Sequence, residues 1–230
     1  MDFFSGFIEL IKQGGVVMII LIIMSIIAVA IVIERLYTFS QQHGDSKGLL
    51  RQLGQKIAAD DMAGAIKVCQ TNKGMLPNIL QFGLLRGTKN RADITDALSI
   101  ALMENLNLLE RNLGIIGTIA VIAPFVGLLG TVLGIIRAFQ DIALKGNSTP
   151  AVVAAGVGEA LVTTAAGLFV AVVSVIFFNY FKTRIKAYNQ EMIVSANQLA
   201  EMLHFHNVGE PIPTDLYQPV APTARTAVAK

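Results

Sequence analysis

Residues 117–138 read GTIAVIAPFVGLLGTVLGIIRA, and no side chain from residue 112 to residue 136 is charged. This spacing of small and polar residues by three or four places them on one face of an α-helix. The members of this small-residue face are Gly117, Ala120, Pro124, Gly127, Thr131, Gly134 and Ala138. In a bilayer, a narrow face of Gly and Ala lets a second helix approach closely. The stretch therefore predicts a membrane helix with a packing face, which we expect to join copies of the chain.

Two further segments are long and apolar enough to cross a bilayer. Residues 16–33 carry no charge and would form a helix of about 27 Å, just enough for the hydrocarbon core. A signal peptide would have a shorter apolar core and a small-residue cleavage site, whereas this run ends in Glu34 and Arg35, so we predict an uncleaved anchor. Residues 160–181 are also uncharged, with Glu159 just before them. Their small or polar side, extended by Gly156, consists of Ala160, Thr163, Thr164, Gly167, Ala171 and Ser174.

Composition places the chain among integral membrane proteins. Of its 230 residues, 53% are hydrophobic and 15% charged, and the mean hydropathy is +0.60. The net charge is only +2 and the basic residues form no patch, which excludes a nucleic-acid partner. Cys69 is the only cysteine, so an intramolecular disulfide and a cysteine-based metal site are both excluded.

Residues that could support catalysis or metal binding have simpler interpretations. No phosphate-binding glycine loop and no nucleophile elbow occur, so ATP hydrolysis and acyl transfer have no support. His204 and His206 would point about 200° apart on a helix, which indicates solvated residues near a helix end. Asp60 and Asp61 indicate the start of a helix. We predict no enzymatic activity, no cofactor and no metal site.

Lysines and arginines near the membrane ends predict the orientation, because they favour the cytoplasmic side. They follow the first span, precede the second and follow the third, at Arg35, Lys47, Arg51, Arg111, Lys182, Arg184 and Lys186. The N-terminus and the connection between the second and third spans carry fewer such residues. We expect both of these parts outside and the C-terminus in the cytoplasm. Labelling of Cys69 by a membrane-impermeant reagent in intact cells should then fail.

The pattern along the chain predicts an all-α protein with three transmembrane helices, of which the second and third extend into a helical cytoplasmic domain. A helix capped by Asp93 should run from residue 94 into the second span without interruption, and the third helix should run from residue 151 to about residue 203. The expected divisions are an interfacial amphipathic helix at 1–15, transmembrane helices at 16–39, 113–139 and 156–181, a cytoplasmic domain at 40–112, a periplasmic connection at 140–155, a cytoplasmic helix extension at 182–208 and a disordered tail at 209–230.

Polar groups inside the spans are the candidate functional residues, because a buried polar group needs a hydrogen-bond partner or a water-filled path beside it. Thr131 and Thr164 either line such a path or bond a carbonyl of their own helix. Glu159 is either an exposed interfacial carboxylate or part of the same site. No acidic residue lies within the cores of the spans, so the chain by itself has no obvious proton carrier.

Residues 123–136, APFVGLLGTVLGII, and residues 158–168, GEALVTTAAGL, resemble the proton-channel family of ExbB, TolQ and MotA, most closely its ExbB and TolQ branch. The resemblance implies a ring-forming homo-oligomer, a pentamer, in the bacterial inner membrane. The ring would house a single-span ExbD- or TolR-like partner that carries a membrane aspartate, coupled to a TonB- or TolA-like transducer for outer-membrane transport.

By position in these motifs, Thr131 and Thr164 correspond to pore-lining threonines and Glu159 to the acidic residue at the start of the third span. Glu159 and Thr164 would lie about 140° apart on a helix, so they need not serve one surface. The residues expected in helix packing are Gly117, Pro124, Gly127, Gly130, Gly134 and Gly167. Two alternatives remain: a TolQ-like subunit for envelope maintenance, and a structural membrane scaffold without ion flux.

Overall fold

The computed structural model describes residues 3–40, 45–86, 90–145 and 150–217, and every regular element in these ranges is a helix. The α-helices are α1 (Phe3–Ser40), α2 (Ser46–Ala58), α3 (Met62–Thr71), α4 (Met75–Arg86), α5 (Arg91–Glu110), α6 (Leu113–Lys145) and α7 (Pro150–Val208), followed by a 3-10 turn, η1 (Thr214–Leu216). By length and composition, three segments could cross a membrane: Gly15–Ser40, Leu113–Gln140 and a stretch within Gly156–Val208. The all-α prediction is confirmed for the described residues, with three candidate membrane helices.

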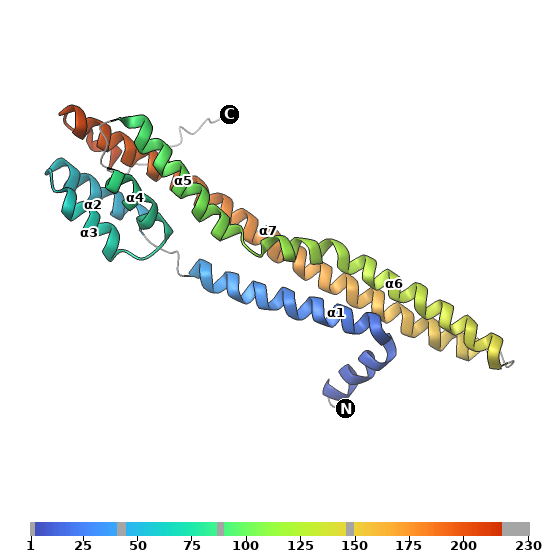
Figure 1. Cartoon of the computed structure of the whole chain (residues 1–230). Helices are drawn as coiled ribbons and strands as arrows, with labels where there is room; N and C mark the ends of the chain where they lie inside the picture. The colour runs from blue at the N-terminus through green and yellow to red at the C-terminus, as the bar shows by residue number, and fades with distance from the viewer. Residues whose placement is uncertain (1–2, 41–44, 87–89, 146–149, 218–230) are drawn as a thin grey trace, which may run out of the picture. The chain divides into compact units, whose positions relative to one another are not determined.

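The chain forms two compact units, which we describe separately. The first comprises residues 1–36 and 111–183, and the second comprises residues 37–110 and 184–230. In the first unit α6 and α7 lie side by side, and α1 packs against both (Figure 1). Val17 and Leu21 of α1 form a buried cluster with Ala123 of α6 and Ala171 of α7. Apolar contact therefore holds the three candidate membrane helices together.

Gly15 interrupts α1. Its dihedral angles, φ 56° and ψ −148°, lie in a region that glycine adopts readily and other residues avoid. The break separates the first helical turns from the apolar helix that follows, at the place where the sequence predicts an interfacial helix to end. The location of residues 1–15 at a membrane surface stays a prediction.

The second unit has a core of apolar side chains from α2, α3 and α4. Leu53, Ile57, Ala65 and Leu80 have no measurable exposure. Cys69 is 1% exposed.

Short polar residues begin two helices of this unit. Asp45 accepts a hydrogen bond from the Gly48 N–H at 3.0 Å, and Asp61 accepts one from the Gly64 N–H at 2.8 Å. The prediction of a helix start at Asp61 is confirmed. The predicted cap at Asp93 is wrong, because α5 begins two residues earlier and the Asn90 side chain accepts from the Ala92 N–H at 3.1 Å.

The predicted uninterrupted helix from residue 94 into the second span is also wrong. α5 ends at Glu110 and α6 begins at Leu113. Between them Asn112 has a φ of 62°, the left-handed conformation that asparagine tolerates better than most residues and that a helix cannot contain. Neither glycine nor proline occurs at this break, so the apolar pattern gave no sign of it. By contrast, α7 runs without interruption, as predicted.

After α7, Gly209 reverses the chain. It has a φ of 78°, its N–H donates to the His206 carbonyl, and the Glu210 N–H donates to the Phe205 carbonyl at 3.0 Å, which is a Schellman motif. The tail then forms η1, and the ring of Tyr217 lies against Gly54 of α2. This part differs from the disorder predicted for residues 209–230, because Tyr217 has a packing partner. Residues 218–230 lie outside the described residues.

The two histidines near the end of α7 are half-buried, not solvated as predicted. His206 Nε2 lies 3.3 Å from Asp60 Oδ1, so the end of α7 meets the turn between α2 and α3. Within the described residues, His204 Nδ1 is a buried atom with no hydrogen-bond partner. The described residues include no group of His, Cys, Asp or Glu that could hold a metal ion.

Candidate functional site

Glycines bring the backbones of α6 and α7 into direct contact. A Cβ atom on Gly127 would lie 2.8 Å from the carbonyl oxygen of Thr163 and 3.2 Å from the Cα of Gly167. A Cβ atom on Gly167 would lie 2.6 Å from the carbonyl oxygen of Ala123. The distances below 3.0 Å are shorter than real Cβ contacts and involve backbone atoms, so any side chain at either glycine would force the two helices apart.

Other glycines continue this contact along α6 and α7. A Cβ atom on Gly134 would lie 2.6 Å from the Cβ of Ala160, and one on Gly117 would lie 2.9 Å from the ring of Phe178. Pro124 lies inside α6. At these glycines the small-residue face packs against α7 of the same chain. Gly127 and Gly134 thus pack within the chain, and the expectation that they join copies of the chain stays a prediction.

Thr131 and Thr164 meet across this contact. Their hydroxyl oxygens lie 2.6 Å apart, and either can be the donor. The Thr131 hydroxyl also donates to the Gly127 carbonyl of its own helix at 3.3 Å, and the Thr164 hydroxyl reaches the same carbonyl from α7 at 3.1 Å. Thr131 is 9% exposed and Thr164 is half-buried. The structure thus brings together two of the three residues predicted for a proton pathway.

Thr163 is a third hydroxyl at this point and was not predicted as a site residue. Its hydroxyl can donate to the Gly127 carbonyl at 3.2 Å or to the Ala160 carbonyl at 2.7 Å, and the residue is 2% exposed. Gly130 provides the space, since a Cβ atom there would lie 2.7 Å from the Cβ of Thr163. The only sequence signal was the membership of Thr163 in the small and polar side of the third span.

Glu159 belongs to the helical backbone of α7, but its side chain lies outside what the structure describes. The apolar parts of all three spans lack acidic residues. The polar centre of the first unit is therefore a set of uncharged groups, namely the three threonine hydroxyls and the Gly127 carbonyl. Such groups can orient water or hydrogen-bond a carboxyl group, but they do not ionise at neutral pH.

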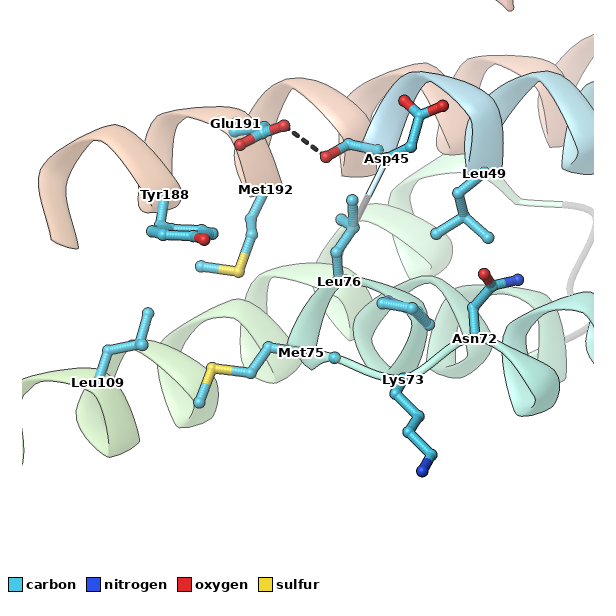
Figure 2. A pocket seen from close by; sticks show the side chains of 13 residues that line it. Asp45, Leu49, Asn72, Lys73, Met75, Leu76, Leu109, Tyr188, Glu191 and Met192 are labelled. Atoms are coloured by element: carbon cyan, nitrogen blue, oxygen red, sulfur yellow. Dashed lines mark hydrogen bonds between the residues drawn. The ribbon is translucent and has the colours of Figure 1, made fainter. Parts of the chain in front are cut away.

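The second unit contains a small cavity (Figure 2). Tyr188 and Met192 of α7 point towards Met75 and Leu109, and the Ser46 hydroxyl bonds Glu191 at the rim. The cavity volume of about 50 Å³ admits a few water molecules and is far below the usual size of a ligand pocket. The candidate site is the threonine cluster, defined as Thr131, Thr163 and Thr164, because its hydroxyls come together between two candidate membrane helices.

The chain has relatives among known proteins. Residues 70–193 match the MotA/TolQ/ExbB proton channel family. The chain is 34% identical over 174 residues to the putative biopolymer transport protein ExbB-like 3 of Synechocystis sp., an alignment that covers 74% of this chain and 82% of that protein. It is 32% identical over 114 residues to the Tol-Pal system protein TolQ of Haemophilus influenzae, which covers 50% of each chain.

The fold also has a solved counterpart. The chain matches a structure titled "Structure of C. jejuni MotAB" with a TM-score of 0.59 and 18% sequence identity, over 85% of this chain and 77% of the other. At this identity the match concerns the fold alone. The matched family region contains α6, the threonine cluster and the apolar part of α7, so the resemblance noted in the sequence is confirmed: this chain belongs to the MotA/TolQ/ExbB proton channel family.

Proposed function

We propose that this chain is the housing subunit of an inner-membrane complex that couples the proton motive force to mechanical work. Copies of the chain, five by family resemblance, would surround an ExbD- or TolR-like single-span partner and act on a TonB- or TolA-like transducer. The observation that most supports this proposal is the Thr131–Thr164 hydroxyl pair, 2.6 Å apart, in spans whose apolar parts contain no acidic residue.

The chemistry of the pair is suited to a shared proton pathway. A membrane carboxyl group that alternates between charged and neutral forms needs neighbours that can donate to one form and accept from the other. A hydroxyl does both, whereas an ammonium or guanidinium group only donates. The partner would supply the carboxyl group, and this chain would supply the hydroxyls.

We assign Glu159 to the same pathway at the start of the third span. Its motif position and its place next to the apolar run of α7 support this assignment. A carboxylate at a membrane boundary can collect protons from the aqueous side. With Thr131 and Thr164 it would complete the pathway that the family resemblance implies.

Replacing the hydroxyls tests the function. Thr131→Val and Thr164→Val keep the side-chain shape and should leave assembly with the partner intact, because a lost hydrogen bond costs only about 0.5–1.5 kcal/mol. The double variant should nevertheless lose energised uptake across the outer membrane. Thr118→Val is the matched control, because the exposed Thr118 hydroxyl donates to the Gly114 carbonyl of its own helix. We expect normal uptake in this control.

If the chain is a structural scaffold without ion flux, the double valine variant should keep its uptake. It would then assemble and support full uptake, and the threonines would have no part in the mechanism. The TolQ match favours one further candidate function, envelope maintenance through a TolA-like transducer. Sensitivity of a deletion strain to detergents, with normal energised uptake, would favour that assignment over a TonB-like one.

The proposed orientation needs a different reporter from Cys69. Burial raises the pKa of the Cys69 thiol to about 11, and with 1% exposure this side chain should resist labelling on either side of the membrane. In a Cys69→Ala background, exposed Ala63 of α3 and exposed Ala143 of α6 can each be replaced by cysteine. We expect Ala143→Cys to react with an impermeant maleimide in intact cells, and Ala63→Cys to react only after permeabilisation. The reverse pattern would invert the topology.

A further inference from the structure

The Gly127 carbonyl has more hydrogen-bond donors around it than it can accept. Three hydroxyls reach it, from Thr131 at 3.3 Å, Thr163 at 3.2 Å and Thr164 at 3.1 Å. Within α6 this carbonyl also faces the N–H of the residue four positions on, as in any α-helix. A carbonyl oxygen has two lone pairs, so these donors compete for it.

The Thr131–Thr164 pair can order its protons in two ways without moving an oxygen atom. If Thr131 donates to Thr164, the Thr164 proton is left over, and if Thr164 donates, the Thr131 proton is left over. In either order the remaining proton can point at the Gly127 carbonyl or turn away to another acceptor. How strongly the Gly127 carbonyl binds this remaining proton decides how readily the proton reorients.

Thr163 is held in a fixed position beside this carbonyl. It is 2% exposed, and its hydroxyl has a second acceptor in the Ala160 carbonyl at 2.7 Å. The space opposite Gly130 accommodates its side chain. Thr163 can therefore shift its proton between two carbonyls while its oxygen stays in place.

We propose that Thr163 is a positioning residue for the proton pathway. Its hydroxyl competes with the Thr131–Thr164 pair for the Gly127 carbonyl, which keeps the remaining proton of the pair loosely held and able to turn towards water or a carboxylate. No charge forms on any threonine, because each hydroxyl only reorients. This inference rests on the proposed function and extends it to a residue that is only 2% exposed.

Thr163→Val removes the competing donor and keeps the shape. The two carbonyls retain their helical N–H partners, so the variant should fold. In liposomes containing the complex with its co-purified partner and a trapped pH dye, proton flux should fall roughly two- to tenfold, the range corresponding to one ordinary hydrogen bond. Thr163→Ser retains the hydroxyl and should restore the flux.

Ser174→Ala is the matched control. Ser174 is a buried hydroxyl of the same helix, also 2% exposed, and it donates to the Val170 carbonyl of its own helix at 2.8 Å. Its loss should lower the thermal stability as much as Thr163→Val does and leave the flux unchanged. An equal fall in flux for both variants would show a merely structural effect and overturn the inference.

The carbonyl itself gives a readout that is independent of flux. Labelling glycine with ¹³C at the carbonyl and leucine with ¹⁵N selects four Gly–Leu bonds in the sequence, those that follow Gly48, Gly83, Gly127 and Gly167. In solid-state NMR the Gly127 carbonyl signal should shift in Thr163→Val and return in Thr163→Ser. The Gly48 and Gly83 signals should not move.

The possible outcomes separate the inference from the function on which it rests. If Thr164→Val abolishes flux while Thr163→Val leaves both the flux and the Gly127 signal unchanged, the inference is wrong and the proposed function stands. If the unmodified complex passes no protons, the proposed function fails, and the inference fails with it.

Discussion

Gly127→Leu should separate α6 from α7 and abolish the folded hairpin. The leucine side chain would have to enter a space bounded by backbone atoms, including the Thr163 carbonyl at 2.8 Å and the Gly167 Cα at 3.2 Å from the first added carbon. Overpacking commonly costs about 1–3 kcal/mol, and here no flexible side chain can move aside. We expect the cost to reach or exceed the upper end of that range, and the protein to lose its cooperative thermal transition in detergent.

Gly114→Leu is the control for this change. Gly114 lies on the same helix, and a Cβ atom there would have nothing within 4 Å. This variant should melt within a few degrees of the parent. If Gly127→Leu melted as Gly114→Leu does, the close contact between α6 and α7 would be wrong, and the threonine pair would not form.

Leu53→Ala should destabilise the second unit by about 2–5 kcal/mol. Leu53 of α2 has no measurable exposure, and its truncation leaves a cavity that the surrounding helices fill only partly. The free energy of unfolding of this unit can be obtained by pulse proteolysis of the full chain in increasing urea. Leu85→Ala is the matched control, because Leu85 of α4 is 60% exposed, and it should change the value by no more than about 0.5 kcal/mol. Equal effects in the two variants would contradict the described core.

The membrane helices were predictable because hydropathy depends on the local sequence alone. The same holds for the buried faces of α2 and α3, where positions such as Leu53 and Ala65 follow the helical period. The break at Asn112 was not predictable in this way. An isolated left-handed asparagine leaves the apolar pattern unchanged, so the pattern predicted one helix where the structure has two.

The candidate site was predictable in part. Periodicity placed Thr131 on the small-residue face and Thr164 on the small side of the third span, and the family motif singled out both. Periodicity does not specify which helix covers such a face, and it therefore failed to predict that Gly127 and Gly134 pack within the chain. Thr163 was missed for the same reason, since its role depends on the Gly127 carbonyl of another helix.

The continuity of α7 has a mechanical consequence. Its part in the first unit includes both Thr164 and Ala171 without a break in the helix. Within the first unit, turning one part of an α-helix about its axis turns the residues next to it, because each backbone hydrogen bond joins residues four apart. A rotation of α7 at Thr164 would therefore also turn Ala171, seven residues further on, which packs against Val17 and Leu21 of α1.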